Sequence, residues 1–345
     1  MKKLFLMLLA VAAVVSCGEK EPSGPDWGNI NKPTPTPDPE NPTEIVVRNI
    51  EPTVELGAKG ENVDGMRFYP GISINIESSK FAANLTEIAN AGFKYIEITI
   101  KHTYGIMDMT DEAVLAKFAE RIGHVKANGL TVWSIHLPFD SVEYTHIAGK
   151  ESVRKQSVEN ILRVLRLCVQ GFPECKNYVL HASKGVLSPR SESVNQARKS
   201  LAEMLPVAKE LGVRIGVENL VGSLCWSMEE MENTIAGFDD AWVTYDIGHA
   251  NCKGLDVVKF LEYIGPRLAT VHMHDTVTGS GVDSHDLLGV PNPGISVWED
   301  VYRTMLEDNR YRGVFLFELS GKNANTVMES YKKIVADYEK KYETK

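Results

Sequence analysis

From residue 71 onward, short runs of strand-forming residues alternate eight times with longer amphipathic runs. The short runs are rich in Ile, Val, Thr, Tyr and Phe, which favours β-strands. The long runs place apolar residues three or four positions apart, which favours α-helices. This alternation predicts a parallel sheet, because each helix returns the chain to the edge where the next strand starts. Eight such units suit a barrel of about 250 residues. We therefore expect an α/β fold, an eight-stranded parallel (β/α)₈ barrel, over residues 71–345.

The expected strands are GISINI from 71, KYIEITI from 94, TVWSIH from 131, NYVLH from 177, VRIGVE from 213, WVTYD from 242, LATVHMH from 268 and GVFLFE from 313. The helix expected around Pro206 should kink or split there, because proline cannot donate the helical hydrogen bond. A doubly wound open sheet is the alternative fold, but no glycine-rich phosphate loop follows the first strand.

Residues 1–16 have the pattern of a secretory signal. Lys2 and Lys3 precede the apolar run LFLMLLAVAAVV, which is too short for a comfortable permanent membrane span. The following VVSC resembles a bacterial lipobox, which implies that Cys17 is lipidated and becomes the new N-terminus. A plain signal peptide is the alternative. We expect an exported bacterial lipoprotein, periplasmic or on the outer membrane or cell surface, that contacts the membrane only through its anchor.

The segment between the anchor and the barrel is expected to carry no chemistry. Residues 17–43 contain PTPTPDPENP, and prolines at this density stiffen an extended chain and prevent a packed core. We expect a linker there and a lead-in segment over residues 44–70.

Charge and cysteine content limit the partners. The net charge is −9, and removal of the signal deletes two lysines and no acid. Such an acidic chain repels phosphate backbones, so no nucleic-acid partner is expected. Four cysteines follow Cys17, with no zinc-module spacing: Cys168, Cys175, Cys225 and Cys252. Export permits disulfides, and burial as small apolar residues is at least as consistent with the sequence.

Carboxylates and imidazoles recur where the expected strands end. The strand ends carry His136, His181, Glu218, Asp246, His272 and Glu318, and the following segments add His249, His274, Asp283 and His285. A single strand-end histidine is more often a hydrogen-bonded packing residue than a ligand. In a barrel, however, these ends meet at one rim, and buried acids and imidazoles are costly unless a positive charge compensates them. The convergence predicts a divalent metal, Mn²⁺, Zn²⁺, Co²⁺ or Mg²⁺.

Four residues near this rim are expected to contact substrate: His249, His274, Lys184 and Trp226. Indole rings stack on sugar faces, and Trp298 is a further candidate for that role, whereas Trp133 lies within a strand and is expected in the core. His124 and His146 are expected to be solvated. The sequence is equally consistent with His102 lining the mouth of the pocket and with His102 lying outside it.

In this order, the motifs VENL, YDIGH, HMHD and FELS resemble the xylose-isomerase-like barrel superfamily, over about residues 70–340. That superfamily contains sugar and sugar-phosphate isomerases and epimerases, together with endonuclease IV. In the epimerase branch, a Glu, an Asp, a His and a second Glu hold one divalent metal, and the two glutamates form the acid–base pair. The resemblance implies these roles for Glu218, Asp246, His272 and Glu318.

The endonuclease IV branch holds three zinc ions with nine ligands. By this resemblance, His136 and His181 join Glu218 around one metal, and His249, Asp283 and His285 hold another. One metal is favoured, and up to three are allowed. The chain departs from both branches at LLGVPNPGISVW, where a glycine-rich acidic turn is usual, and it lacks a basic, aromatic-interleaved insert for clasping DNA.

The resemblance implies proton abstraction next to the carbonyl of a free or keto-sugar, with a metal polarising that carbonyl. Glu218 would remove the proton and Glu318 would return one, giving an epimer or an aldose–ketose isomer. A lyase or hydratase on an oxidised glycoside would share the first step. The alternatives are a multi-zinc phosphodiester hydrolase and a non-catalytic carbohydrate-binding protein, which would not need two opposed glutamates.

Overall fold

The structure is a computed structural model that describes residues 68–343, apart from 102–104, 184, 310 and 320. The expected signal peptide, Cys17, the linker and nearly all of the lead-in segment lie outside the described residues, as do His102 and Lys184. Within the described part of the chain, no helix combines the length and apolar composition needed to cross a bilayer.

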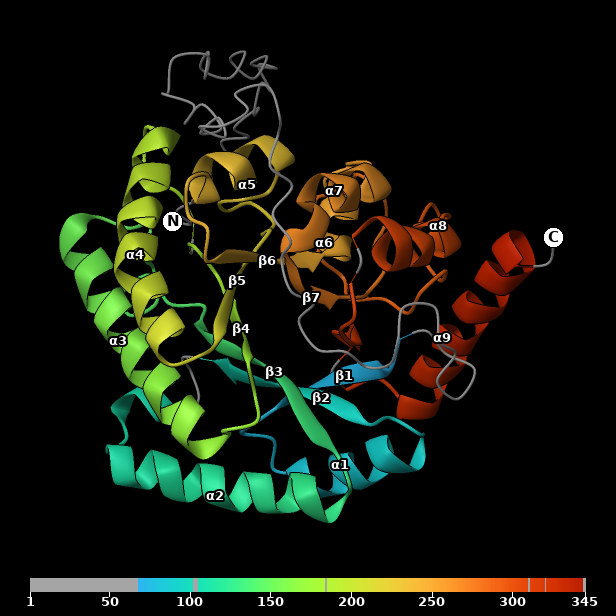
Figure 1. Cartoon of the computed structure of the whole chain (residues 1–345), viewed down its shortest axis with the longest axis horizontal. Helices are drawn as coiled ribbons and strands as arrows, with labels where there is room; N and C mark the ends of the chain where they lie inside the picture. The colour runs from blue at the N-terminus through green and yellow to red at the C-terminus, as the bar shows by residue number, and fades with distance from the viewer. Residues whose placement is uncertain (1–67, 102–104, 184, 310, 320, 344–345) are drawn as a thin grey trace, which may run out of the picture. The chain divides into compact units, whose positions relative to one another are not determined.

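Eight parallel strands stand at the centre of the molecule (Figure 1). They are β1 (Pro70–Asn75), β2 (Tyr95–Lys101), β3 (Thr131–Phe139), β4 (Asn177–Leu180), β5 (Arg214–Glu218), β6 (Ala241–Asp246), β7 (Leu268–His272) and β8 (Phe315–Phe317). They pair in the order β7-β6-β5-β4-β3-β2-β1-β8. Met273 bridges Phe317 and donates its N–H to the carbonyl of Leu316 at 2.7 Å, which joins the two ends of the sheet. The expected eight-stranded parallel barrel is confirmed.

Helices surround the strands on the outside (Figure 1). They are α1 (Phe81–Asn90), α2 (Asp111–Ala127), α3 (Glu151–Gly171), α4 (Arg190–Glu210), α5 (Met228–Ile235), α6 (Ile247–Cys252), α7 (Val257–Ile264), α8 (Trp298–Arg303) and α9 (Ala324–Tyr338). The short α6 begins directly after β6, because the side chain of Asp246 accepts a hydrogen bond from the N–H of His249 at 2.7 Å. This cap places Asp246 and His249 on one side of the rim.

The strands sort their side chains between the helix layer and the barrel interior. On β2, Ile96, Ile98 and Ile100 are fully buried in the apolar core. Successive side chains of a strand point to opposite faces, so Glu97 lies on the other face, where it contacts His272 of β7. Polar groups are therefore buried inside the barrel, beneath its C-terminal rim.

The split expected in α4 and the solvent exposure expected for His146 are both wrong. α4 continues through Pro206 without splitting. Pro206 and Ala202, whose carbonyl loses its helical donor, are both exposed residues on the solvent side of α4. His146 is only 8% exposed, because the loop before α3 is tied down by Ser200, which donates to the carbonyl of Ile147 at 2.7 Å.

Other residues lie as the sequence indicates. His124 is 41% exposed on α2, and Trp133 is buried in the core. Cys168, Cys175, Cys225 and Cys252 are all buried and unpaired, which favours their interpretation as small apolar residues.

Candidate functional site

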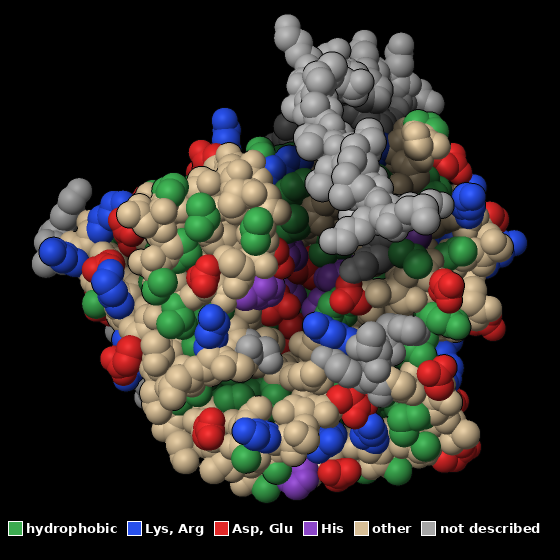
Figure 2. Space-filling view, turned by 180° about the vertical axis from the view of Figure 1, so that it is seen from behind, with side chains coloured by type: hydrophobic (Ala, Val, Ile, Leu, Met, Phe, Trp, Pro, Cys, Tyr) green, Lys and Arg blue, Asp and Glu red, His purple; other side chains and the backbone are tan. Residues whose placement is uncertain are grey.

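A cavity of about 840 Å³ opens at the C-terminal ends of the strands. In Figure 2, histidine and acidic side chains gather in a hollow in the middle of the visible face. The cavity is lined by His181, His249, Glu218, Asp283 and Glu318, among others. It lies on the rim where sites form in parallel barrels, and its volume suits a small organic ligand.

The first ligand group consists of His136 from β3, His181 just after β4 and Glu218 at the end of β5. The Nε2 atoms of the two histidines lie 3.1 Å apart, and Oε2 of Glu218 lies 3.3 Å from His136 and 2.9 Å from His181. Tetrahedral ligands about 2.0–2.1 Å from a zinc ion stand about 3.4 Å apart. The three donor atoms therefore have the spacing of a metal's ligands.

The second group consists of Glu218, Asp246, His272 and Glu318, whose donor atoms all lie within 4.8 Å of one another. Nδ1 of His272 lies 3.1 Å from Oε1 of Glu218, 3.1 Å from Oε2 of Glu318 and 3.8 Å from Oδ2 of Asp246. Three carboxylates and one imidazole form a donor set that suits a divalent cation of intermediate hardness. These residues fit the metal that the sequence predicts.

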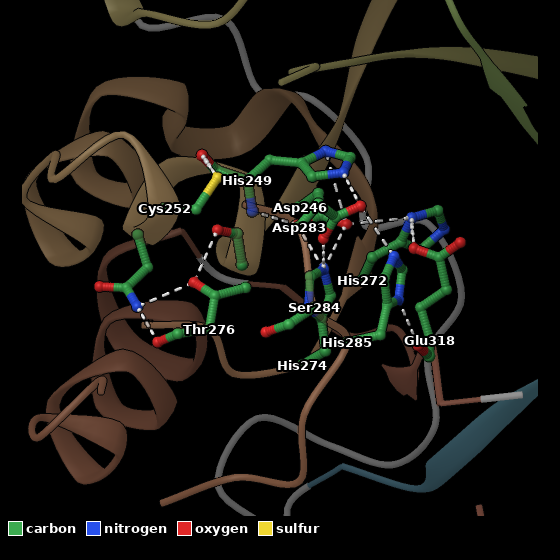
Figure 3. A network of polar contacts seen from close by, with 12 residues as sticks. Asp246, His249, Cys252, His272, His274, Thr276, Asp283, Ser284, His285 and Glu318 are labelled. Atoms are coloured by element: carbon green, nitrogen blue, oxygen red, sulfur yellow. Dashed lines mark hydrogen bonds and ion pairs between the residues drawn. The ribbon is translucent and has the colours of Figure 1, made fainter. Parts of the chain in front are cut away.

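The third group consists of His249, His274, Asp283 and His285 (Figure 3). Oδ2 of Asp283 lies 3.2 Å from Nε2 of His249 and 2.9 Å from Nε2 of His285. His274 instead places its Nε2 3.0 Å from both carboxylate oxygens of Asp246. His274 therefore connects the second and third groups.

Backbone carbonyls orient three of these imidazoles. Nδ1 of His136 lies 3.0 Å from the carbonyl O of Leu137, and Nδ1 of His249 lies 2.7 Å from that of Asn219. Nδ1 of His285 lies 2.8 Å from the carbonyl O of Glu318. An Nδ1–H that donates to a carbonyl leaves Nε2 available as a ligand, and each of these rings turns Nε2 toward its group.

Carboxylates and imidazoles shift each other's protonation strongly. Burial lowers the pKa of His249, but Asp246, Asp283 and Glu218 outweigh burial and raise it to about 10. Burial also lowers the pKa of His285, but the hydrogen bond with Asp283 and the nearby carboxylates outweigh burial and raise it to about 10. Burial raises the pKa of Glu218, but His272 and His181 hold it well below its usual value. The buried carboxylates are therefore stable only with positive charge beside them. Protons on the imidazoles or a bound cation would provide that charge.

Two expected substrate contacts lie elsewhere. Among the described residues, the cavity lining includes His249 but neither His274, which is fully buried, nor Trp226. The indole N–H of Trp226 donates to the carbonyl of His249 at 3.0 Å, so this ring supports the wall from behind. Trp298 is buried at the start of α8, also outside the lining.

Several residues that shape the site were not predicted from the sequence as site residues. Asn219 accepts from the N–H of Asp246 at 2.8 Å and donates to its carbonyl at 2.7 Å, which fixes the end of β6 beside β5. Lys101 and Phe139 line the cavity wall. Glu97, buried beneath the second group, has one sequence signal, an acid inside the apolar run YIEITIK.

Gly248→Ala is expected to lower the free energy of unfolding by about 1–3 kcal/mol, as overpacked sites do. A Cβ at Gly248 would stand 2.0 Å from Cε1 of His274. That ring cannot easily retreat, because it is fully buried and stacks on His285 with centroids 4.1 Å apart. Urea unfolding provides the measurement.

The matched control is Gly123→Ala within α2, where a Cβ meets nothing within 4 Å. This control should stabilise the protein by about 0.5–1 kcal/mol. Equal stability of Gly248→Ala and the parent protein would contradict the tight packing at α6.

Comparison with known proteins agrees with this architecture. The profile of the xylose isomerase-like TIM barrel family matches residues 85–336. The chain is 29% identical to the uncharacterized protein MJ1311 of Methanocaldococcus jannaschii over 218 residues, which cover 59% of this chain and 69% of that protein. The structure of the present chain resembles that of a D-tagatose 3-epimerase-like protein, with a TM-score of 0.63 and 21% identity. The alignment covers 78% of this chain and 98% of the other.

A further structural relative is 3-keto-D-glucoside 4-epimerase, YcjR, from E. coli, with a TM-score of 0.57 and 16% identity. The alignment covers 77% of this chain and 98% of the epimerase. At these identities, the two structural similarities establish a shared fold. The family profile extends over most of the barrel and includes every residue of the three ligand groups. The chain therefore belongs to the xylose isomerase-like TIM barrel family.

Proposed function

We propose that this protein is a metal-dependent sugar isomerase or epimerase that moves a proton next to a carbonyl. The observation that carries the proposal is the placement of Glu218 and Glu318. Both carboxylates line the cavity, and each has an oxygen 3.1 Å from Nδ1 of His272. Glu218 ends β5, and Glu318 directly follows β8. In the closed barrel, β6 and β7 lie between these two strands. Two carboxylates thus flank one small region of the cavity floor.

The residues of the chain then have distinct tasks. Glu218, Asp246, His272 and Glu318 would hold the metal, which when bound would polarise a sugar carbonyl and acidify the neighbouring C–H. Glu218 removes that proton, and Glu318 delivers a proton from the other side. Return to the same carbon gives the epimer, and return to the former carbonyl carbon gives the aldose–ketose isomer. Phe139 contributes an apolar wall for a sugar face.

The proposed substrate class is a free or glycosidically linked keto-sugar. The structural relatives include a D-tagatose 3-epimerase-like protein and a 3-keto-D-glucoside 4-epimerase, which supports carbonyl chemistry here. A lyase or hydratase acting on an oxidised glycoside would begin with the same proton removal.

Proton exchange tests the proposal. D-tagatose and a 3-keto-D-glucoside are incubated with the metal-loaded protein in D₂O, and deuterium is sought at the carbon next to the carbonyl. Deuterium incorporation supports the proposal. Absence of deuterium, together with hydrolysis of bis(p-nitrophenyl) phosphate, would reject it.

A multi-metal phosphodiester hydrolase is the second candidate function, because three ligand groups lie side by side. Asp283→Asn distinguishes the two. Asp283 belongs only to the third group, so a single-metal isomerase should lose less than about tenfold in turnover, far less than for loss of an acid–base group. A three-metal hydrolase would instead lose about as much as it does from Glu218→Gln. Steady-state rates on both substrate classes provide the measurement.

We further propose that the protein is exported and anchored through Cys17. The support is the lysine pair, the short apolar run and VVSC in the sequence. Cys17→Ser is expected to block lipid attachment and to release or misprocess the protein, as seen by detergent partitioning of cell fractions. A variant that remains membrane-bound like the parent protein would contradict the anchor.

A further inference from the structure

Glu97 is a carboxylate buried inside the barrel, with none of its surface exposed. It lies on β2, and its Oε2 accepts a hydrogen bond from the hydroxyl of Ser134 on β3 at 2.7 Å. Its Oε1 has no hydrogen-bond partner among the described residues. A buried carboxylate with so few partners is costly unless a positive charge or a further hydrogen bond compensates it.

The same Oε2 lies 3.2 Å from Nε2 of His272, across the barrel. A carboxylate only accepts hydrogen bonds, so this contact requires a proton on Nε2 of His272. Nδ1 of the ring then faces Glu218 and Glu318, each at 3.1 Å. Those carboxylate oxygens also only accept. A neutral ring would therefore turn a bare lone pair toward oxygen lone pairs, an arrangement that a cation between them would relieve.

His272 is held differently from the other oriented imidazoles of the site. His136, His249 and His285 place Nδ1 against backbone carbonyls and present Nε2. At His272 the roles of the two nitrogens are exchanged, and the orienting group is a charged side chain. A carboxylate that accepts from a metal-binding histidine fixes its tautomer and raises its basicity, and its loss typically costs about 10–100-fold in metal affinity.

We propose that Glu97 is a positioning residue for the metal centre, which fixes His272 so that Nδ1 faces Glu218, Asp246 and Glu318. The inference rests on the proposed metal at the second ligand group. Glu97 does not line the cavity, so it acts by holding His272 and not by touching a bound substrate. Ser134 holds the carboxylate of Glu97 in place.

Zinc binding and histidine NMR test this role without an activity assay. Zn²⁺ affinity is measured by competition with a chromophoric chelator for the full-length protein, Glu97→Gln, Glu97→Ala and Ser134→Ala. Glu97→Gln keeps the shape and should weaken Zn²⁺ binding about tenfold, and Glu97→Ala about 100-fold. Ser134→Ala should weaken it less than either. In the Zn²⁺-loaded parent protein, ¹⁵N spectra should show His272 protonated at Nε2, with slow exchange of that proton, and this signature should be lost in Glu97→Ala.

Glu77→Gln is the matched control, because it removes a carboxylate that pairs with Lys117 at 2.6 Å, belongs to none of the three ligand groups and does not line the cavity. Its Zn²⁺ affinity should equal that of the parent protein. If Glu97→Gln and Glu97→Ala both bind Zn²⁺ like the parent protein, or if His272 carries its proton on Nδ1, the role of Glu97 is overturned. If the parent protein itself binds no divalent metal, the proposed metal centre fails instead. Circular dichroism of each variant separates loss of affinity from loss of folding.

Discussion

Glu218→Gln or Glu318→Gln is expected to lower kcat on the order of 10²-fold or more, with a much smaller change in KM. Glutamine keeps the side-chain shape and one oxygen, but it removes the basic carboxylate that accepts and returns the proton. The measurement is steady-state turnover of a keto-sugar, together with the rate of deuterium incorporation.

Both glutamates are also expected metal ligands, so each rate must be divided by the metal bound per protein. Glu77→Gln again supplies a matched loss of a carboxylate that belongs to none of the ligand groups and does not line the cavity, and its kcat should be unchanged. A variant at Glu218 or Glu318 that keeps full turnover per bound metal would remove that residue from the acid–base pair. An equal loss after Asp283→Asn would favour the hydrolase.

Removal of divalent metal with a chelator is expected to abolish deuterium incorporation and to lower Tm. Glu218 and Asp246 are 1% and 0% exposed, and a metal bound at this group would offset their negative charge in the folded state only. A ligand present at a thousand times its Kd stabilises the folded state by about 4 kcal/mol, and this contribution disappears on chelation. Differential scanning fluorimetry and the D₂O assay give the two readouts.

Return of Mn²⁺, Co²⁺, Zn²⁺ or Mg²⁺ one at a time should restore activity with at least one ion. Metal analysis of the reloaded protein counts the sites. One equivalent supports the isomerase, and three equivalents support the hydrolase. Full activity in thoroughly chelated protein would contradict the proposed chemistry.

The strands and most of the candidate ligands could be predicted from the sequence, because local patterns encode them. Alternating β-rich and amphipathic runs predict eight parallel strands, and the observed strands begin and end within a few residues of those runs. A parallel barrel brings the C-terminal ends of its strands to one rim. Residues such as His136 and Glu318, far apart in the chain, are therefore expected together from topology alone.

Single-residue environments were less predictable. Pro206 removes one helical hydrogen bond, but it lies on the exposed side of α4, and the helix continues through it. His146 is polar and lies outside any helix or strand, yet contacts of its loop with α4 bury it. Trp226 has the chemistry of a sugar platform, but its indole N–H supports the backbone at His249.

The sequence by itself determined the barrel, the rim and the types of donor atom on that rim, since these follow from strand periodicity and from which residue ends each strand. Only the tertiary structure decided how the donors pair. Glu97 and His272 are 175 positions apart and lie on strands that are not neighbours in the sheet, yet they touch at 3.2 Å. No local pattern encodes a contact across a barrel, because it depends on the diameter of the closed sheet and on how deep each side chain sits within it.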